Sequence, residues 1–230
     1  MRRALLIILL LTLGLLGAGC GSSSSDSAAT STDETTSAET TAGVATAGCT
    51  DVAAPAPRED GNATEPKERL DPEKTYNLVF KTNCGSFTVT LDLATAPATA
   101  TSLVALSKSG FYDDTIFHRI VPGFVIQGGD PTQSGSGGAG YQTVDPPPAD
   151  ASYTKGVVAM AKTGAEPPGT SGSQFFVVTG ADIGLPADYA IVGNVTSGID
   201  VAERIGELGD PATEKPTRPV VIRSVTVEEQ

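Results

Sequence analysis

One stretch of the chain, FHRIVPGFVIQGGD at residues 117–130, concentrates side chains that could hold and polarise a peptide group. Its only permanently charged cation is Arg119, which lies close to Gln127 and to the aromatic residues Phe117 and Phe124. A guanidinium is a strong hydrogen-bond donor, and an amide both donates and accepts. Such a set could grip a polar group beside an apolar one without a nucleophile or a metal ion.

A second stretch, GTSGSQFF at residues 169–176, supplies another glutamine, Gln174, and two phenylalanines that include Phe176. It follows the short run Ala159-Met160-Ala161. Both stretches are rich in the β-branched and aromatic residues typical of strands. A sheet must therefore bring their side chains together.

Other chemistry is disfavoured by the surroundings of each candidate motif. Residues 135–140 match G-x-G-x-x-G, but three prolines at 146–148 prevent the helix that a dinucleotide site needs, so we expect a flexible glycine-rich loop. No serine is framed as G-x-S-x-G to pair with His118, which we interpret as a hydrogen-bonded structural residue. A metal site is not expected, because cysteine and histidine occur only at the scattered positions 20, 49, 84 and 118.

Composition limits the partners and the extent of the core. The 230 residues include 15 Lys and Arg against 27 Asp and Glu, a formal net charge of −12, so we expect no nucleic-acid partner. All five Tyr and seven Phe lie at or beyond Tyr76. We therefore place one folded domain at residues 75–230 and expect a monomer.

The first 19 residues are typical of an export signal, with two arginines, an apolar run and a small-residue end. The cysteine that follows, Cys20, resembles the lipidated cysteine of bacterial lipoproteins, although Gly17 stands where leucine is usual. The resemblance implies a lipid anchor on the outer face of the bacterial cell membrane. Plain secretion and an uncleaved anchor remain alternatives.

Residues 20–74 are predicted to form a disordered acidic tether rich in Ser, Thr and Ala. They contain no aromatic residue and few large aliphatic ones, so they cannot bury enough surface to offset chain entropy. About 50 flexible residues span on the order of 40 Å. Such a tether would hold the domain away from the membrane.

The domain at 75–230 is predicted to be mainly β, a closed antiparallel barrel of about eight strands capped by two α-helices. The turn at Asn83-Cys84-Gly85 predicts an N-terminal hairpin. One helix should begin at Pro97 and stop at Gly110, and another should span Ile199 to Ile205. The expected strands lie at residues 75–81, 86–93, 115–119, 123–128, 156–160, 173–179, 189–195 and 220–227.

From Thr75 to the C-terminus the two stretches resemble the cyclophilin family of peptidyl-prolyl isomerases, as does Pro97-Ala98-Thr99-Ala100. The resemblance implies no cofactor and substrates that contain Xaa-Pro bonds. The chain departs from the family pattern at four places. Val125 stands where the family has the pocket methionine, Lys162 where it has an asparagine and Tyr189 where it has the pocket histidine. Asp182-Ile183-Gly184 replaces a segment that usually holds a tryptophan, and residues 165–168 lengthen a loop. The residues implied are Arg119, Phe124 and Gln127 for catalysis and Val125, Ala161, Gln174, Phe176, Leu185 and Tyr189 for substrate binding.

Two functions follow from the resemblance. The first is an active isomerase that assists the folding of exported polypeptides. The second is a catalytically weak module that binds Pro-containing chains as a chaperone or adaptor. Retention of Arg119, Phe124, Gln127 and Phe176 favours the first.

If Cys20 carries a lipid, Cys49 and Cys84 remain as an even pair in an exported protein, where disulfides persist. We expect them to form a bridge that orders the end of the tether. The alternative is two free thiols, with Cys84 a small buried residue in the turn.

Overall fold

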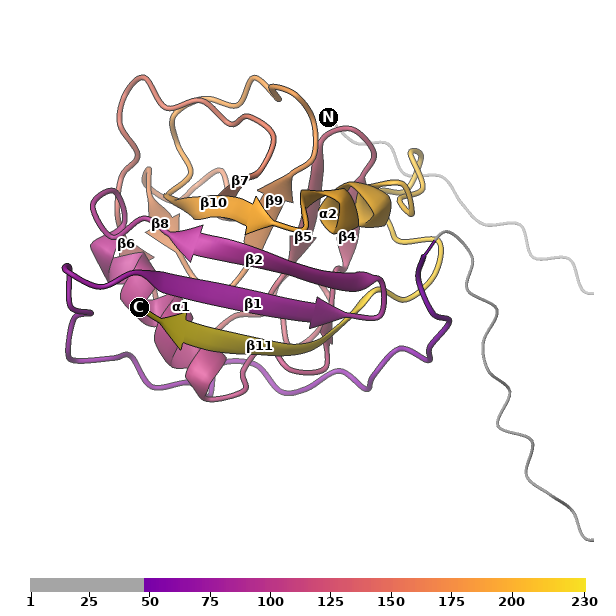
Figure 1. Ribbon diagram of the computed structural model, residues 1–230, viewed down its shortest axis with the longest axis horizontal. Coiled ribbons are helices and arrows are strands. Elements are labelled where there is room, and N and C mark those ends of the chain that lie inside the picture. Colours follow the sequence, from indigo (N-terminus) through magenta and orange to yellow (C-terminus); the bar gives the residue numbers. More distant parts are fainter. Residues whose placement is uncertain (1–47) are drawn as a thin grey trace, which may run out of the picture. The chain divides into compact units, whose positions relative to one another are not determined.

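The computed structural model describes residues 48–230, in which the first regular element is a hairpin (Figure 1). β1 (Tyr76–Thr82) and β2 (Gly85–Leu91) pair antiparallel, with Phe80 opposite Phe87 and their rings stacked 4.8 Å apart. Alternate residues of β2 are buried, because only one face of the hairpin covers the core. The predicted N-terminal hairpin is confirmed.

Nine strands of the described chain form one curled antiparallel sheet in the order β3-β11-β1-β2-β10-β7-β9-β5-β4. The edge strands β3 (Thr115–Ile116) and β4 (Arg119–Val121) follow each other in the chain, so the predicted strand at 115–119 is divided. The N–H of Phe117 still donates to the Val220 carbonyl oxygen at 3.0 Å, one residue beyond the last β3–β11 pair, and from Arg119 on the chain pairs with β5 instead. The other strands are β5 (Val125–Gly128), β7 (Val157–Met160), β9 (Phe175–Val178), β10 (Ile191–Ser197) and β11 (Val221–Glu229), with β6 (Thr143–Val144) and β8 (Thr170–Ser171) in a separate pair.

Two helices of the described chain pack on this sheet, which confirms the mainly β fold with two helices. α1 (Pro97–Lys108) begins at a proline, whose fixed φ suits the first helical turn, and packs against β11. Gly110, with φ +71°, follows its end. α2 (Ile199–Gly206) packs against β2 and β5 through an apolar face that includes Ile205.

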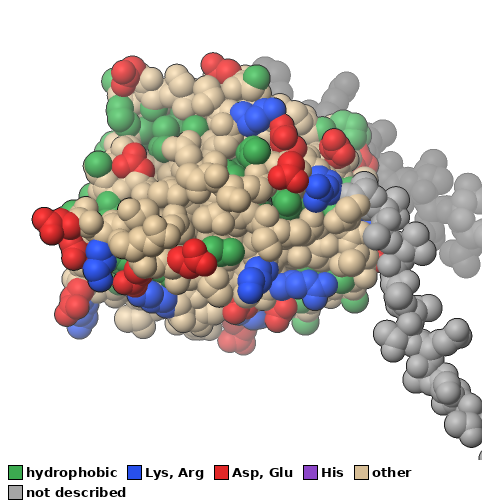
Figure 2. Space-filling view, viewed as in Figure 1, with side chains coloured by type: hydrophobic (Ala, Val, Ile, Leu, Met, Phe, Trp, Pro, Cys, Tyr) green, Lys and Arg blue, Asp and Glu red, His purple; other side chains and the backbone are tan. Residues whose placement is uncertain are grey.

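Between residues 48 and 230 the buried apolar residues form two clusters. The larger one fills the space between the curled sheet and the helices and contains Phe87, Phe117 and Phe175. The smaller one is built on β5, β7 and β9 and contains Val125 and Phe176. On the face shown in Figure 2, acidic and basic side chains are interspersed, and hydrophobic side chains gather over the loops above β10.

Residues 48–75, which we name the strap, lie along the outside of the folded domain before β1 (Figure 1). Arg58 N–H donates to Pro131 O at 2.8 Å, Gly61 N–H to Gly138 O at 3.2 Å and Ala63 N–H to Ala139 O at 3.1 Å. Residues 48–74 are therefore ordered, so the prediction of a disordered tether through residue 74 is wrong there, whereas the expected Cys49–Cys84 bridge is present. Composition misled because backbone hydrogen bonds and this cross-link hold the segment, with few apolar side chains such as Leu70 packed on the core.

The sulfur atoms of Cys49 and Cys84 are bonded, and this disulfide joins the start of the strap to the β1–β2 turn. Both residues are almost fully buried. Beside them Thr50 N–H donates to Asn83 O at 2.8 Å, and Asn83 Nδ2 donates to Thr50 O at 2.8 Å. A covalent and a hydrogen-bonded link thus anchor the strap at one end.

The predicted signal peptide at residues 1–19, the lipidated Cys20 and the tether up to residue 47 lie outside the described residues. Between residues 48 and 230, neither helix has the length and apolar character that a bilayer crossing requires.

Candidate active site

β4, β5 and β9 carry the candidate residues in one row across the sheet. Arg119 on β4 is opposite Gln127 on β5, and Gln127 is opposite Phe176 on β9. Directly opposite residues of neighbouring strands point to the same face, so these three side chains share one face. Two residues before Gln127 on the same face of β5, Val125 is opposite Val178 of β9. A charged donor and an apolar patch therefore lie next to each other.

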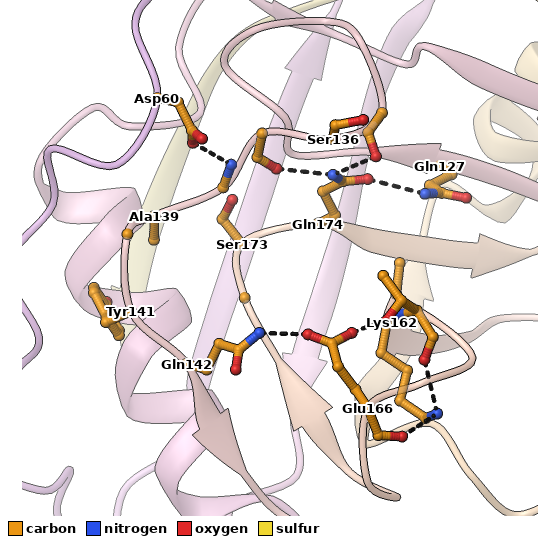
Figure 3. Close-up of a pocket in the computed structure, with 17 residues that line it drawn as sticks. Asp60, Gln127, Ser136, Ala139, Tyr141, Gln142, Lys162, Glu166, Ser173 and Gln174 are labelled. Atoms are coloured by element: carbon orange, nitrogen blue, oxygen red, sulfur yellow. Dashed lines mark hydrogen bonds between the residues drawn. The ribbon is translucent and has the colours of Figure 1, made fainter.

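Side-chain hydrogen bonds link the row to Gln174. Arg119 Nη1 donates to Gln127 Oε1 at 3.3 Å. Gln127 Nε2 donates to Gln174 Oε1 at 3.0 Å (Figure 3). Gln174 Nε2 in turn donates to the carbonyl oxygens of Gly135 at 3.0 Å and Gly137 at 2.8 Å. These bonds fix the orientation of both amides.

Arg119 keeps part of its donor capacity free. Its side chain is 36% exposed, and its Nε donates to Glu214 Oε2 at 2.6 Å. In the part of the chain that the structure describes, Nη2 has no hydrogen-bond partner. Sequence reasoning missed Glu214, which lies 95 residues after Arg119 in a loop that no motif marks.

The residues expected to line a proline pocket lie together in the smaller cluster. Val125 and Phe176 are 2% and 4% exposed and belong to its buried part. Phe124, Leu185 and Tyr189 are partly buried against them. The rings of Phe176 and Tyr189 meet edge to face with centroids 5.6 Å apart. The cluster offers an apolar surface beside the Arg119 row.

Lys162 ties the lengthened loop to this pocket. Its side chain is 2% exposed, and Nζ lies 2.6 Å from Asp188 Oδ2 and 5.6 Å from the centroid of the Tyr189 ring. Nζ also donates to the carbonyl oxygens of Thr163 and Glu166, so the buried charge is fully paired. A hydrogen bond from the Thr163 N–H lowers the pKa of the Glu166 carboxyl.

A hollow of about 640 Å³ opens beside the row (Figure 3). Ala161 N–H donates to Gln174 O at 2.9 Å on one side of it, and on the other Asp60 of the strap accepts from Gly138 N–H at 2.6 Å. The strap thus contributes a side chain that the domain boundary at residue 75 excluded. The lining includes Asp60, Gln127, Ala161, Lys162, Glu166, Gln174 and residues 135–142.

The glycine-rich loop at 135–140 is held by Asp130, so the prediction of a flexible loop is wrong. Asp130 has no exposed surface and accepts from Gly135 N–H at 2.6 Å, Gly137 N–H at 3.2 Å and Thr132 N–H at 2.7 Å. Burial by itself would raise the pKa of Asp130, but these hydrogen bonds hold it below its usual value. The loop leads to β6, with no helix beginning within it.

His118 takes no part in the row. Both ring nitrogens are shielded and have no hydrogen-bond partner among residues 48–230, so the prediction of a hydrogen-bonded histidine is wrong. Burial lowers the pKa of His118, while the charge of Asp130 opposes that change. The ring is therefore neutral near pH 7.

Comparisons with known proteins identify the family of this chain. Residues 77–227 match the family described as cyclophilin type peptidyl-prolyl cis-trans isomerase/CLD. The chain is 39% identical over 158 residues to peptidyl-prolyl cis-trans isomerase-like 1 of Aspergillus oryzae, covering 66% of this chain and 96% of that protein. It is 36% identical over 156 residues to peptidyl-prolyl cis-trans isomerase ppi1 of Schizosaccharomyces pombe, covering 66% and 99%.

A solved structure shows the same fold. The crystal structure of a Cryptosporidium parvum cyclophilin type peptidyl-prolyl cis-trans isomerase superposes with a TM-score of 0.62 at 32% identity. The match covers 67% of this chain and 98% of that one. With the family match over residues 77–227, this chain belongs to the cyclophilin-type peptidyl-prolyl cis-trans isomerases.

Proposed function

We propose that the Arg119 row and the apolar cluster beside it form the isomerase site. Phe124, Val125, Phe176, Leu185 and Tyr189 receive the proline ring, and Gln127, Gln174 and Ala161 hold the flanking chain. The observation that carries this proposal is that Arg119 shares a face with Phe176 and keeps Nη2 unused among residues 48–230.

These residue types suit a reaction in which no bond is made or broken. Rotation about a peptide C–N bond faces a barrier of roughly 18–20 kcal/mol because of its partial double-bond character. In the twisted form, conjugation is lost and the prolyl nitrogen can accept a hydrogen bond. A guanidinium that donates to this nitrogen stabilises the transition state more than the planar ground state. Arg119 performs that step in the proposal, and no side chain has to titrate.

The relatives support an Xaa-Pro substrate. The Cryptosporidium parvum protein has a second crystal structure determined in the presence of the dipeptide Ala-Pro, with a TM-score of 0.61 and 31% identity to this chain. We extend this substrate class to the present site on the basis of Phe176 and the cluster around it.

A protease-coupled isomerisation assay on a short Ala-Pro peptide separates this proposal from the binding-module alternative. An isomerase raises the rate of cis-trans relaxation above the uncatalysed rate, by an amount proportional to the enzyme concentration. A Pro-binding chaperone or adaptor would bind the peptide and leave the uncatalysed rate, with exchange over tens of seconds or more, unchanged.

We also propose that the isomerase is exported and lipid-anchored through Cys20 on the outer face of a bacterial cell membrane, where it acts on exported polypeptides. The support is the arginine pair, apolar run and small residues that precede Cys20. Labelling with a radioactive fatty acid in a bacterial host should mark the full chain and not Cys20→Ala. Equal labelling of both proteins, or of neither, would contradict the anchor.

A further inference from the structure

The loop between α2 and β11 brings a carboxylate to Arg119. Glu214 Oε2 lies 2.6 Å from Arg119 Nε, and the two side chains are 47% and 36% exposed. The N–H of Ile120, the next residue on β4, donates to the Glu214 carbonyl oxygen at 2.8 Å. Glu214 is therefore attached through its backbone to the strand that carries Arg119.

This loop holds Glu214 in an uncommon backbone conformation. Its φ is +58°, in the left-handed region. Glu214 N–H donates to Asp210 O at 2.7 Å, and Asp210 Oδ1 accepts from Ala212 N–H at 2.7 Å and Thr213 N–H at 3.2 Å. Asp210 N–H donates to Lys215 O at 2.9 Å. The carboxylate projects from a turn that its own hydrogen bonds fix.

The contacts of Arg119 divide its donors into two groups. Nε faces Glu214 and one Nη1 hydrogen faces Gln127, while Nη2 has no partner in residues 48–230. A guanidinium is planar, so fixing Nε and Nη1 also fixes the plane in which Nη2 lies. The pair with Glu214 can therefore decide where the unused donors point.

We propose that Glu214 is a positioning residue that orients the Arg119 guanidinium for isomerisation. The inference rests on the catalytic role proposed for Arg119. Glu214 acts through Arg119 and does not touch the substrate. Because Arg119 is needed most in the twisted transition state, loss of the pair should lower kcat and leave KM nearly unchanged.

The test measures kcat and KM on an Ala-Pro peptide for the unmodified protein and for Glu214→Gln, which keeps the side-chain shape and removes the charge. Both partners are partly exposed, so we expect kcat to fall about threefold with KM within about twofold. The matched control is Glu203→Gln, which removes the exposed ion pair with Lys155 and should change neither constant. An unchanged kcat in Glu214→Gln, or a change only in KM, would overturn the positioning role.

The same substitution made in the Arg119→Ala protein separates the role of Glu214 from the catalytic role of Arg119. If Glu214 acts through Arg119, adding Glu214→Gln to Arg119→Ala should change kcat no further. A further fall would show that Glu214 acts by another route and would overturn the inference alone. Full activity of Arg119→Ala by itself would overturn both the inference and the proposed catalytic role.

Discussion

The Arg119 row and the strap are both ordered, but different interactions hold them. Phe176 in the row is 4% exposed and packs into an apolar cluster that spans three strands. In the strap only Cys49 is fully buried, and the segment is held by its disulfide and by backbone hydrogen bonds such as that from Gly61 to Gly138. Apolar burial stabilises one region, whereas a cross-link that limits the unfolded chain stabilises the other.

The largest effect should follow from breaking the row's packing. Phe176→Ala removes a buried ring from the smaller cluster and should lower the free energy of unfolding by about 3–5 kcal/mol. It should also raise KM, because the ring belongs to the proposed proline pocket. Denaturant unfolding and peptide kinetics measure both effects. Val144→Ala, at a residue that is 55% exposed, is the control and should change stability by less than about 0.5 kcal/mol.

Breaking the cross-link should destabilise the protein and leave the site intact. Cys49 and Cys84 are separated by 35 residues, so Cys49→Ser with Cys84→Ser should lower the free energy of unfolding by roughly 3–4 kcal/mol. Amide exchange at Arg58, Gly61 and Ala63 should accelerate, while kcat of the folded fraction stays within about twofold of the unmodified value.

Thiol counting on residues 21–230 tests the premise of that experiment. We expect no titratable thiol before reduction and two after it. Two thiols without reductant would show that the bridge does not form in the isolated protein.

A smaller effect, which depends on pH, should appear at His118. Burial lowers its pKa in the folded state below the usual 6.5, so the unfolded chain binds the extra proton first as pH falls. The stabilisation that comes from keeping His118 neutral is fully present above about pH 6.5, its pKa in the unfolded chain. It is lost as pH falls through the folded-state pKa, so the free energy of unfolding decreases there. Unfolding measured between about pH 7 and pH 5 should show this decline, and His118→Gln should reduce it. An identical decline in both proteins would assign it to other groups.

The row could be predicted from sequence because its residues lie within two strand-forming stretches. The pairing of β4 with β5 brings Arg119 to Gln127, and the pairing of β5 with β9 brings Gln127 to Phe176. In the strap only the cysteine pair gave a signal, through the expected Cys49–Cys84 bridge. The rest of the strap gave none, because backbone hydrogen bonds do not depend on side-chain type. Glu214 was missed for a related reason, since its position depends on a turn with φ +58° far along the chain.

Substitution of Arg119 tests the catalytic assignment most directly. Arg119→Ala should lower kcat/KM on an Ala-Pro peptide by about tenfold or more, a loss of about 1.4 kcal/mol of transition-state stabilisation. Stability should change little, because the side chain is 36% exposed. Arg223→Ala, at an exposed position on β11, is the matched control and should retain full activity. Unchanged turnover in a folded Arg119→Ala protein would contradict the account.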